Sequence, residues 1–176
     1  MTMPAAAPAS KRKPPGRILQ GKLPAPLFWP VQAPAKWFVQ MSAMPAIDRI
    51  TAAKRGVPAL FLTRLAKFTG ESKEQLNEWL GFSRATVDRK ARAGQMLSTD
   101  ESARVIGFAR LVGQVQSLVN ESGDPTGFDA ARWLAMWLNN PLPALAGRLP
   151  GSYMDTVEGQ QMISDLLARA RGGAFA

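Results

Sequence analysis

The sequence contains no cysteine and no histidine among its 176 residues. Without cysteine, the chain can form neither a disulfide framework nor a thiolate metal site. Without histidine, it lacks the side chain that most often transfers protons at neutral pH and most often ligates metals. These two absences argue against an enzyme and against a metalloprotein. We therefore expect no catalytic residue, no cofactor and no metal ligand.

The sequence also lacks long apolar runs. No stretch approaches the roughly 18 residues of a membrane-spanning helix, and the first residues lack the apolar core of a secretory signal. Apolar residues nevertheless make up 46% of the chain, which is enough to bury a core. We predict a soluble, cytoplasmic protein with a folded body.

Acidic residues are scarce in the first third of the chain. Residues 1–55 hold nine Lys and Arg against one acidic residue, whereas residues 121–176 hold four against six. Excess positive charge favours polyanions such as DNA, although a solvated basic segment without a partner is the alternative. Residues 1–45 are rich in Pro and Ala and are predicted to be an extended, flexible leader. Their aromatic residues Trp29, Trp37 and Phe38 should pack either on the protein itself or on a partner.

The pattern of residues 46–120 predicts a helix-turn-helix domain. A short helix over 46–55, with Ile47, Ile50 and Ala53 on one face, should end at Gly56, and Pro58 suits the first turn of a helix that stops at Gly70. Ser72 and Gln75 form a capping box for a helix that turns Leu76, Trp79 and Leu80 inward. After a tight turn at Gly81, Ser83 caps a second helix over 84–92 whose Val87 and Ala91 face the first.

The second helix has a basic outer face and should lie in the DNA major groove. Arg84 is the best candidate for a base contact, because a guanidinium can grip guanine through two hydrogen bonds. Arg89, Lys90 and Arg92 should hold phosphates. A small bundle with a merely solvated basic face is the alternative. The full predicted DNA-binding set is Ser83, Arg84, Ala85, Thr86, Asp88, Arg89, Lys90 and Arg92.

A second capping box, from Ser98 to Glu101, should open a long helix that runs to about Val119. Its broad apolar stripe predicts a spine that joins the two halves, with use as a dimer seam the alternative to burial within one protomer. In residues 121–176, Asp124, Pro125 and Thr126 should begin a helix that ends before Pro141, and its stripe is predicted to be core: Trp133, Leu134, Trp137 and Leu138. Thr156 should cap the last helix, whose buried face is Ile163, Leu166, Leu167 and Ala170.

Nothing in the sequence predicts a long strand, so the fold class is all-α. Six segments resemble one family in that family's order: Arg55-Gly56-Val57-Pro58, Leu80-Gly81-Phe82-Ser83-Arg84-Ala85-Thr86, Leu97-Ser98-Thr99-Asp100-Glu101-Ser102, Pro143-Ala144-Leu145-Ala146-Gly147-Arg148, Asp155-Thr156-Val157-Glu158-Gly159 and Gly173-Ala174-Phe175-Ala176. They closely resemble the Xre/MbcA/ParS antitoxins, the partners of RES-domain toxins in type II toxin–antitoxin systems. The departures are small: Leu142 replaces an Asn, Ala146 a Gly, Tyr153-Met154 a Leu pair and Gly172 a His.

The resemblance implies an Xre-like helix-turn-helix bundle followed by a small helical toxin-binding domain. Such an antitoxin neutralises a toxin that degrades NAD, blocks the toxin's active site with its C-terminal segment, and represses its own operon as a homodimer or larger assembly. We expect Phe175 and Ala176 to act as an apolar plug. The predicted toxin-binding set is Leu145, Arg148, Met154, Leu166, Arg169, Arg171, Gly172, Gly173, Ala174, Phe175 and Ala176.

Two other readings remain open at this point. A stand-alone transcription repressor would use its C-terminal half only to dimerise. An enzyme could use Asp155 and Glu158 as a carboxylate pair, but helix capping accounts for both residues without catalysis.

Overall fold

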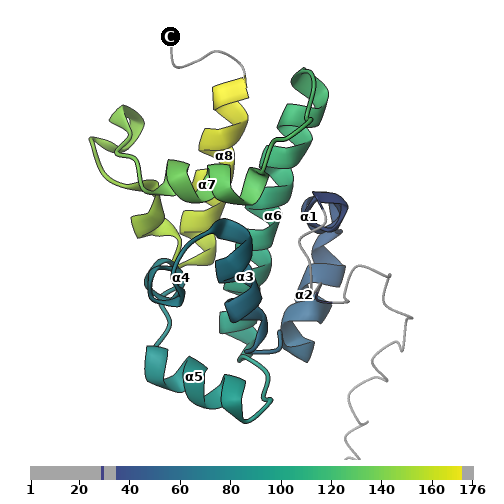
Figure 1. The fold of residues 1–176 in the computed structure, drawn as a ribbon, viewed down its shortest axis with the longest axis vertical. Coiled ribbons are helices and arrows are strands. Elements are labelled where there is room, and N and C mark those ends of the chain that lie inside the picture. Colours follow the sequence, from purple (N-terminus) through teal and green to yellow (C-terminus); the bar gives the residue numbers. More distant parts are fainter. Residues whose placement is uncertain (1–28, 30–34, 172–176) are drawn as a thin grey trace, which may run out of the picture.

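The computed structural model describes residue 29 and residues 35–171. In this part of the chain only isolated β-bridges interrupt a helical fold, which confirms the all-α prediction (Figure 1). The elements in order are α1 (Ala35–Ala43), α2 (Ala46–Arg55), α3 (Phe61–Thr69), α4 (Lys73–Trp79), α5 (Arg84–Arg92), α6 (Thr99–Ser122), α7 (Ala130–Leu138), the 3-10 helices η2 (Pro143–Leu145) and η3 (Pro150–Tyr153), and α8 (Val157–Arg171).

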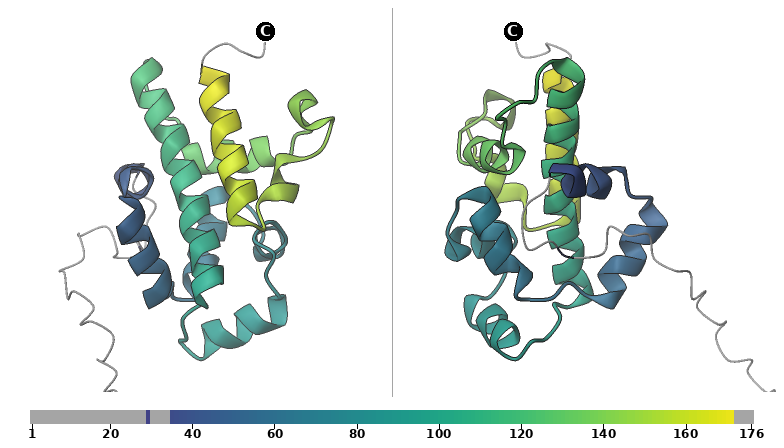
Figure 2. Two further views of the ribbon diagram at one scale, coloured as in Figure 1. Left: turned by 180° about the vertical axis from the view of Figure 1, so that it is seen from behind. Right: turned by 45° about the vertical axis from the view of Figure 1, so that its right-hand side comes forward.

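Helix α6 is the spine of the molecule. It runs through the centre with α8 alongside it, and α1 and α2 pack on its other side (Figures 1 and 2). Its N-terminus carries the predicted capping box: the Ser98 hydroxyl accepts from the Glu101 N–H, and the Glu101 carboxylate accepts from the Ser98 N–H. Its stripe from Val105 to Val115 is buried within one chain, so these residues are not free to form a dimer seam. The helix continues three residues past Val119.

Helix α1 corrects the prediction that all of residues 1–45 form an extended leader. Residues 35–43 are helical, and Trp37, Phe38 and Met41 are buried. Gly113 of α6 makes this packing possible, because a Cβ there would lie 1.8 Å from the Phe38 carbonyl oxygen. The apolar area buried by these side chains outweighs the helix-breaking composition around them. Residues 1–28 and 30–34 lie outside the described part of the chain.

Trp29 tests the expectation that the aromatic residues pack either on the protein itself or on a partner. Its ring packs against Trp37 at 5.9 Å and against Phe61 at 4.9 Å between ring centroids. These aromatic side chains therefore pack on the protein itself.

The region from α2 to α3 differs from prediction in two details. Helix α2 has the predicted bounds, but a different face is turned to the core. Ala52 and Ala53 are buried, whereas Ile47 and Ile50 are exposed. Pro58 lies in a β-bridge with Met96 instead of a helical turn, and α3 begins at Phe61. The segment around Pro58 is held extended by backbone hydrogen bonds from Leu97 to Val57 and from Ala59 to Gln95.

Helix α7 begins later than predicted. Asp129 is its N-cap and accepts from the N–H groups of Ala131 and Arg132, whereas Asp124 accepts from Thr126 in a separate turn upstream. In α8, Thr156 accepts from the Gly159 N–H as expected. The predicted buried face of α8 is confirmed at three positions: Ile163, Leu166 and Leu167. The side chains of Ala170 and Arg171 lie outside the described part.

The two halves of the chain interlock. The Trp79 ring of α4 stacks on Phe108 of α6 with centroids 6.2 Å apart, and a Cβ on Gly151 would lie 2.4 Å from the Trp79 Nε1. Gly81, in the turn between α4 and α5, lies against Asp155. The C-terminal half therefore supports the turn that positions α5. Along the described residues, no helix is both long and apolar enough to cross a bilayer.

Candidate DNA-binding and protein-binding surfaces

Helix α5 lies at one end of the molecule, with its outer face open (Figure 1). Its Val87 is buried and anchors the helix to the core, as the sequence predicted, and Ala91 is half-buried. Of the predicted DNA-binding residues, Ser83, Arg84, Ala85, Arg89 and Arg92 are exposed, while Thr86 and Asp88 are half-buried. The shape and charge of this face suit the major groove, so DNA contact by these residues stays our prediction.

Arg84, the predicted base contact, has acidic partners in the free protein. Its guanidinium lies 2.9 Å from a Glu74 carboxylate oxygen and 3.8 Å from Asp88, which also pairs with Lys73 at 3.2 Å. The Arg84 and Glu74 side chains are 67% and 50% exposed, so solvent screens their attraction. Arg84 can exchange these weak pairs for a base edge.

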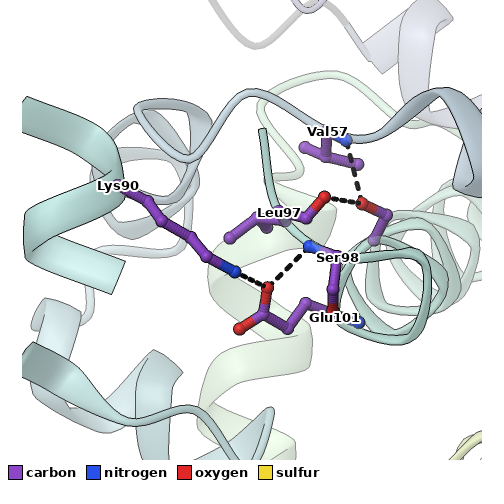
Figure 3. Close-up of polar contacts among 6 residues, drawn as sticks. Val57, Lys90, Leu97, Ser98 and Glu101 are labelled. Carbon is purple, nitrogen blue, oxygen red and sulfur yellow. Dashed lines mark hydrogen bonds and ion pairs between the residues drawn. The ribbon is translucent and has the colours of Figure 1, made fainter. Parts of the chain in front are cut away.

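Lys90 does not belong to the open face. Its ammonium group lies 2.5 Å from the Glu101 carboxylate, and the two side chains are only 17% and 15% exposed (Figure 3). Burial acts most strongly on Glu101 and would raise its pKa, but the hydrogen bonds from Lys90 and Ser98 outweigh it and lower the pKa below its ordinary value. The geometry thus disfavours Lys90 as a phosphate contact, because its charge is already engaged in fastening α5 to α6.

Ser102 is a positioning residue that the sequence reading missed. It is fully buried on α6, accepts a hydrogen bond of 2.9 Å from the Val57 N–H, and donates to the Leu97 carbonyl oxygen at 3.4 Å (Figure 3). These bonds fix the segment that follows α5 against the core. A serine one turn inside a helix gives no sequence signal for this role, since the partners come from distant segments.

The loop between α7 and α8 carries two of the residues predicted to bind another protein. Leu145 is half-buried at the end of η2, and Arg148 is exposed with its guanidinium 3.4 Å from the Tyr153 hydroxyl. The loop closes on itself through hydrogen bonds from the Leu142 N–H to the Arg148 carbonyl oxygen and from the Gly147 N–H to the Leu142 carbonyl oxygen. It presents Arg148 on a fixed support.

Helix α7 presents aromatic residues that were predicted to be core. Leu134 and Leu138 are buried as expected, but Trp133 and Trp137 are only half-buried. Their rings stack nearly parallel, with centroids 6.3 Å apart and planes 15° apart. The i, i+4 spacing was visible in the sequence, but it does not distinguish a core stripe from one at the edge of the core.

Among the described residues, no group of three or more acidic side chains could hold a metal ion. Asp155 and Glu158 are exposed beside the N-terminus of α8, and Glu158 lies in its first turn, where the helix dipole favours negative charge.

Comparison with known proteins explains the division of the chain. Residues 48–110 match the antitoxin Xre-like helix-turn-helix domain, and residues 126–173 match the antitoxin Xre/MbcA/ParS C-terminal toxin-binding domain. The chain is also 45% identical over 130 residues to the protein named Prs ADP-ribosylating antitoxin from Sphingobium sp. (strain YBL2). The aligned region covers 74% of this chain and 82% of the relative.

The chain belongs to the Xre/MbcA/ParS antitoxins. The helix-turn-helix match spans α2 to the middle of α6 in this antitoxin, and the toxin-binding match spans α7 and α8. The two regions that the sequence predicted as DNA-binding and toxin-binding are therefore present, in the predicted order.

The predicted toxin contacts of the antitoxin need correction at Met154 and Leu166. Met154 is fully buried and its carbonyl oxygen accepts a hydrogen bond of 2.9 Å from Gln160 Nε2, and Leu166 is only 8% exposed. Neither side chain can reach a partner in this structure. Arg169 is exposed on α8. The predicted contacts at residues 172–176 and the Arg171 side chain lie outside the described part.

Proposed function

We propose that this antitoxin neutralises a RES-domain toxin that consumes NAD, and that it does so by placing its C-terminal residues, 172–176, over the toxin's active site. The toxin-binding match, which extends to residue 173, supports a role for this end of the chain. The name of the 45% identical relative refers to ADP-ribosylation. Because that reaction takes its ADP-ribose from NAD, the name supports a toxin whose pocket holds NAD.

Helix α8 is suited to carry such a plug. It has 15 residues, which corresponds to about 22 Å of helix. Thr156 caps its start, and Ile163 and Leu167 anchor it on the core. Because α8 is a rigid helix, the residues that it carries lose less conformational entropy when they enter a pocket than residues on a flexible segment would. In this mechanism Phe175 supplies the apolar anchor, and Arg169 and Arg148 are the exposed cations of the same half.

We further propose that α5 binds the promoter of the antitoxin's own operon and that paired copies of the protein repress it. Arg84 would read a base edge, and Arg89 and Arg92 would hold phosphates. Lys90 instead keeps α5 in position through Glu101. Two-fold pairing would place one α5 in each of two successive major grooves, as other helix-turn-helix dimers do.

One observation supports both roles most strongly. The basic face of α5 and the C-terminal end of α8 lie at opposite ends of a single packed body (Figures 1 and 2). A toxin held at one end would therefore leave the other end open to DNA. A stand-alone repressor has no need of this arrangement.

The test is a deletion of residues 174–176 in the full-length antitoxin. We expect the truncated protein to fold and to bind promoter DNA like the wild type, but to leave its toxin active, because the truncated tail no longer fills the NAD pocket. Growth of cells that co-express the antitoxin and a RES-domain toxin from the same host would be measured together with cellular NAD. Rescue of growth by the truncated protein would show that occlusion by the tail is wrong.

A further inference from the structure

The toxin-binding half presents apolar side chains that pack against the edge of the core and are only partly buried by it. We define the aromatic stripe as Phe128, Trp133, Met136 and Trp137. Phe128 packs against Trp133 at 6.3 Å between ring centroids, Trp133 stacks on Trp137, and Met136 beside them is 60% exposed. The core side of α7 is formed by other residues, chiefly Leu134 and Leu138, which are fully buried. The stripe therefore lies along the edge and outer face of the helix.

A cavity of about 290 Å³ adjoins the stripe. Phe128 and Trp133 form one wall, and no charged side chain lines it. Ser122, at the end of α6, is its single polar lining residue and is exposed to solvent. A mostly apolar surface pocket of this size beside aromatic rings suits one large apolar side chain. The other lining residues are Val115, Leu118, Val119 and Leu167.

We propose that the aromatic stripe and this cavity are the docking surface for the toxin, and that the cavity receives an apolar side chain from the rim of the toxin's pocket. The inference rests on the proposed function, and it adds a second point of attachment apart from the C-terminal plug. Tryptophan and methionine are enriched at protein interfaces, and partly exposed tryptophans in a row are typical of binding hot spots.

Position in the fold argues for the toxin as the occupant. The stripe lies within residues 126–173, the stretch that matches the toxin-binding domain. Leu167, which lines the cavity, lies four residues before Arg171, about one helical turn from the end of α8. The cavity therefore lies about one helical turn from Arg171, the last residue of α8. A toxin that binds residues 172–176, as proposed above, would meet this neighbouring surface.

The same placement argues against DNA as the occupant. Helix α5 lies at the opposite end of the molecule from the C-terminal end of α8 (Figure 2). An uncharged, aromatic surface also lacks the cations that phosphates require. Toxin docking at the stripe is thus compatible with DNA binding at α5.

Two substitutions test the surface without removing core contacts. Ser122→Trp fills the cavity from its exposed mouth, and Met136→Glu places a charge in the stripe. Ile47→Glu is the matched control, because Ile47 is a 68% exposed aliphatic residue on α2 that belongs to neither the stripe nor the cavity lining. Each full-length variant would be titrated with a purified RES-domain toxin from the same host. Promoter binding by each variant confirms that it is folded.

We expect Ser122→Trp and Met136→Glu each to weaken toxin binding about tenfold or more, and Ile47→Glu to leave it unchanged. We also expect a protein without residues 172–176 to retain measurable binding that Met136→Glu weakens further, since docking and plugging are separate contacts. Wild-type affinity in both stripe variants would overturn the docking surface, even where the truncated protein no longer inhibits. Absence of binding by the wild-type protein would overturn the proposed function together with it.

Discussion

Ala146 has a strained backbone, and its replacement gives a quantitative test of the structure. Its φ of 54° and ψ of 38° lie in the left-handed region, and it is the only non-glycine residue with positive φ among the described residues. The loop forces this conformation, because the Ala146 N–H donates to the Pro143 carbonyl oxygen and the next N–H donates to Leu142. The resemblance to the antitoxin family places a glycine where this chain has Ala146. The structure now supplies the physical reason for that glycine.

The size of the effect follows from two opposing terms. A left-handed conformation costs an L-residue about 1–2 kcal/mol, and glycine removes that cost. Glycine also increases the conformational entropy of the unfolded chain, which offsets about 0.4–1 kcal/mol. We therefore expect Ala146→Gly to raise the free energy of unfolding by about 0.5–1 kcal/mol.

Gly147→Ala is the converse change in the same loop. Gly147 has a φ of 78°, and a Cβ there would meet no atom within 4 Å. Its substitution should cause no steric clash, and its only cost should be the left-handed backbone of an L-residue, partly offset by the lower entropy of the unfolded chain. The protein should therefore lose about 0.5–1 kcal/mol of stability.

Urea and thermal denaturation, both monitored by tryptophan fluorescence, would measure both variants. We expect the midpoints to move in opposite directions, with melting temperatures separated by roughly 2–8 °C, because 1 kcal/mol shifts a domain of this size by about 2–4 °C. Promoter affinity should stay unchanged in both, since the loop lies far from α5. If Ala146→Gly lowered stability, the left-handed assignment at this residue would be refuted.

Three further changes test the other structural claims. Arg89→Gln should weaken promoter binding at all sequences and reduce the slope of log affinity against log salt by about 1, as measured in a fluorescence titration at several salt concentrations. Glu101→Gln should cost about 1.5–3 kcal/mol near neutral pH by breaking the contact with Lys90. The pKa of Glu101 is lowered in the folded protein, so the difference in the free energy of unfolding between variant and wild type should shrink as the pH falls below the ordinary carboxyl pKa and through the folded-state pKa. Urea denaturation at several pH values would measure this difference. Gly113→Ala should destabilise the protein by about 1–3 kcal/mol or detach α1, because its Cβ would collide with the Phe38 backbone; limited proteolysis at α1 would separate these outcomes.

The elements that the sequence predicted well are those with local signals. Ser72 and Ser98 form side-chain caps as predicted, and the Ser98–Glu101 pair forms the full reciprocal box, whereas Ser83 occupies the N-cap position of α5 without a side-chain cap hydrogen bond. Helices α2 and α5 nevertheless have the predicted bounds. Helix α1 was missed for the opposite reason. Its stability comes from packing against α6, more than 60 residues away along the chain, and no local pattern reports a contact of that kind.

The candidate sites were predicted less completely. Helical spacing shows which residues share a face of a helix, but not whether the residues at the edge of that face are buried or exposed. Lys90 belongs by spacing to the basic face of α5, yet Glu101 holds it on the inner side. Met154 was predicted to contact the toxin, but the fold buries it completely. Trp133 and Trp137 were assigned to the core and prove to be half-buried at its edge.

The interlock between the halves decides how the two activities of the antitoxin can be separated. Trp79 belongs to the helix-turn-helix, but part of its cover is Gly151, which lies beyond α7, and Gly81 in the turn rests on Asp155. A fragment that ends with α6 would expose the Trp79 ring and lose the support beneath the turn that positions α5. Loss of DNA binding in such a fragment would therefore say nothing about contacts between the toxin-binding half and DNA. Point substitutions at exposed positions of the intact chain avoid this confusion, because they leave both the Trp79 contact and the α6 core in place.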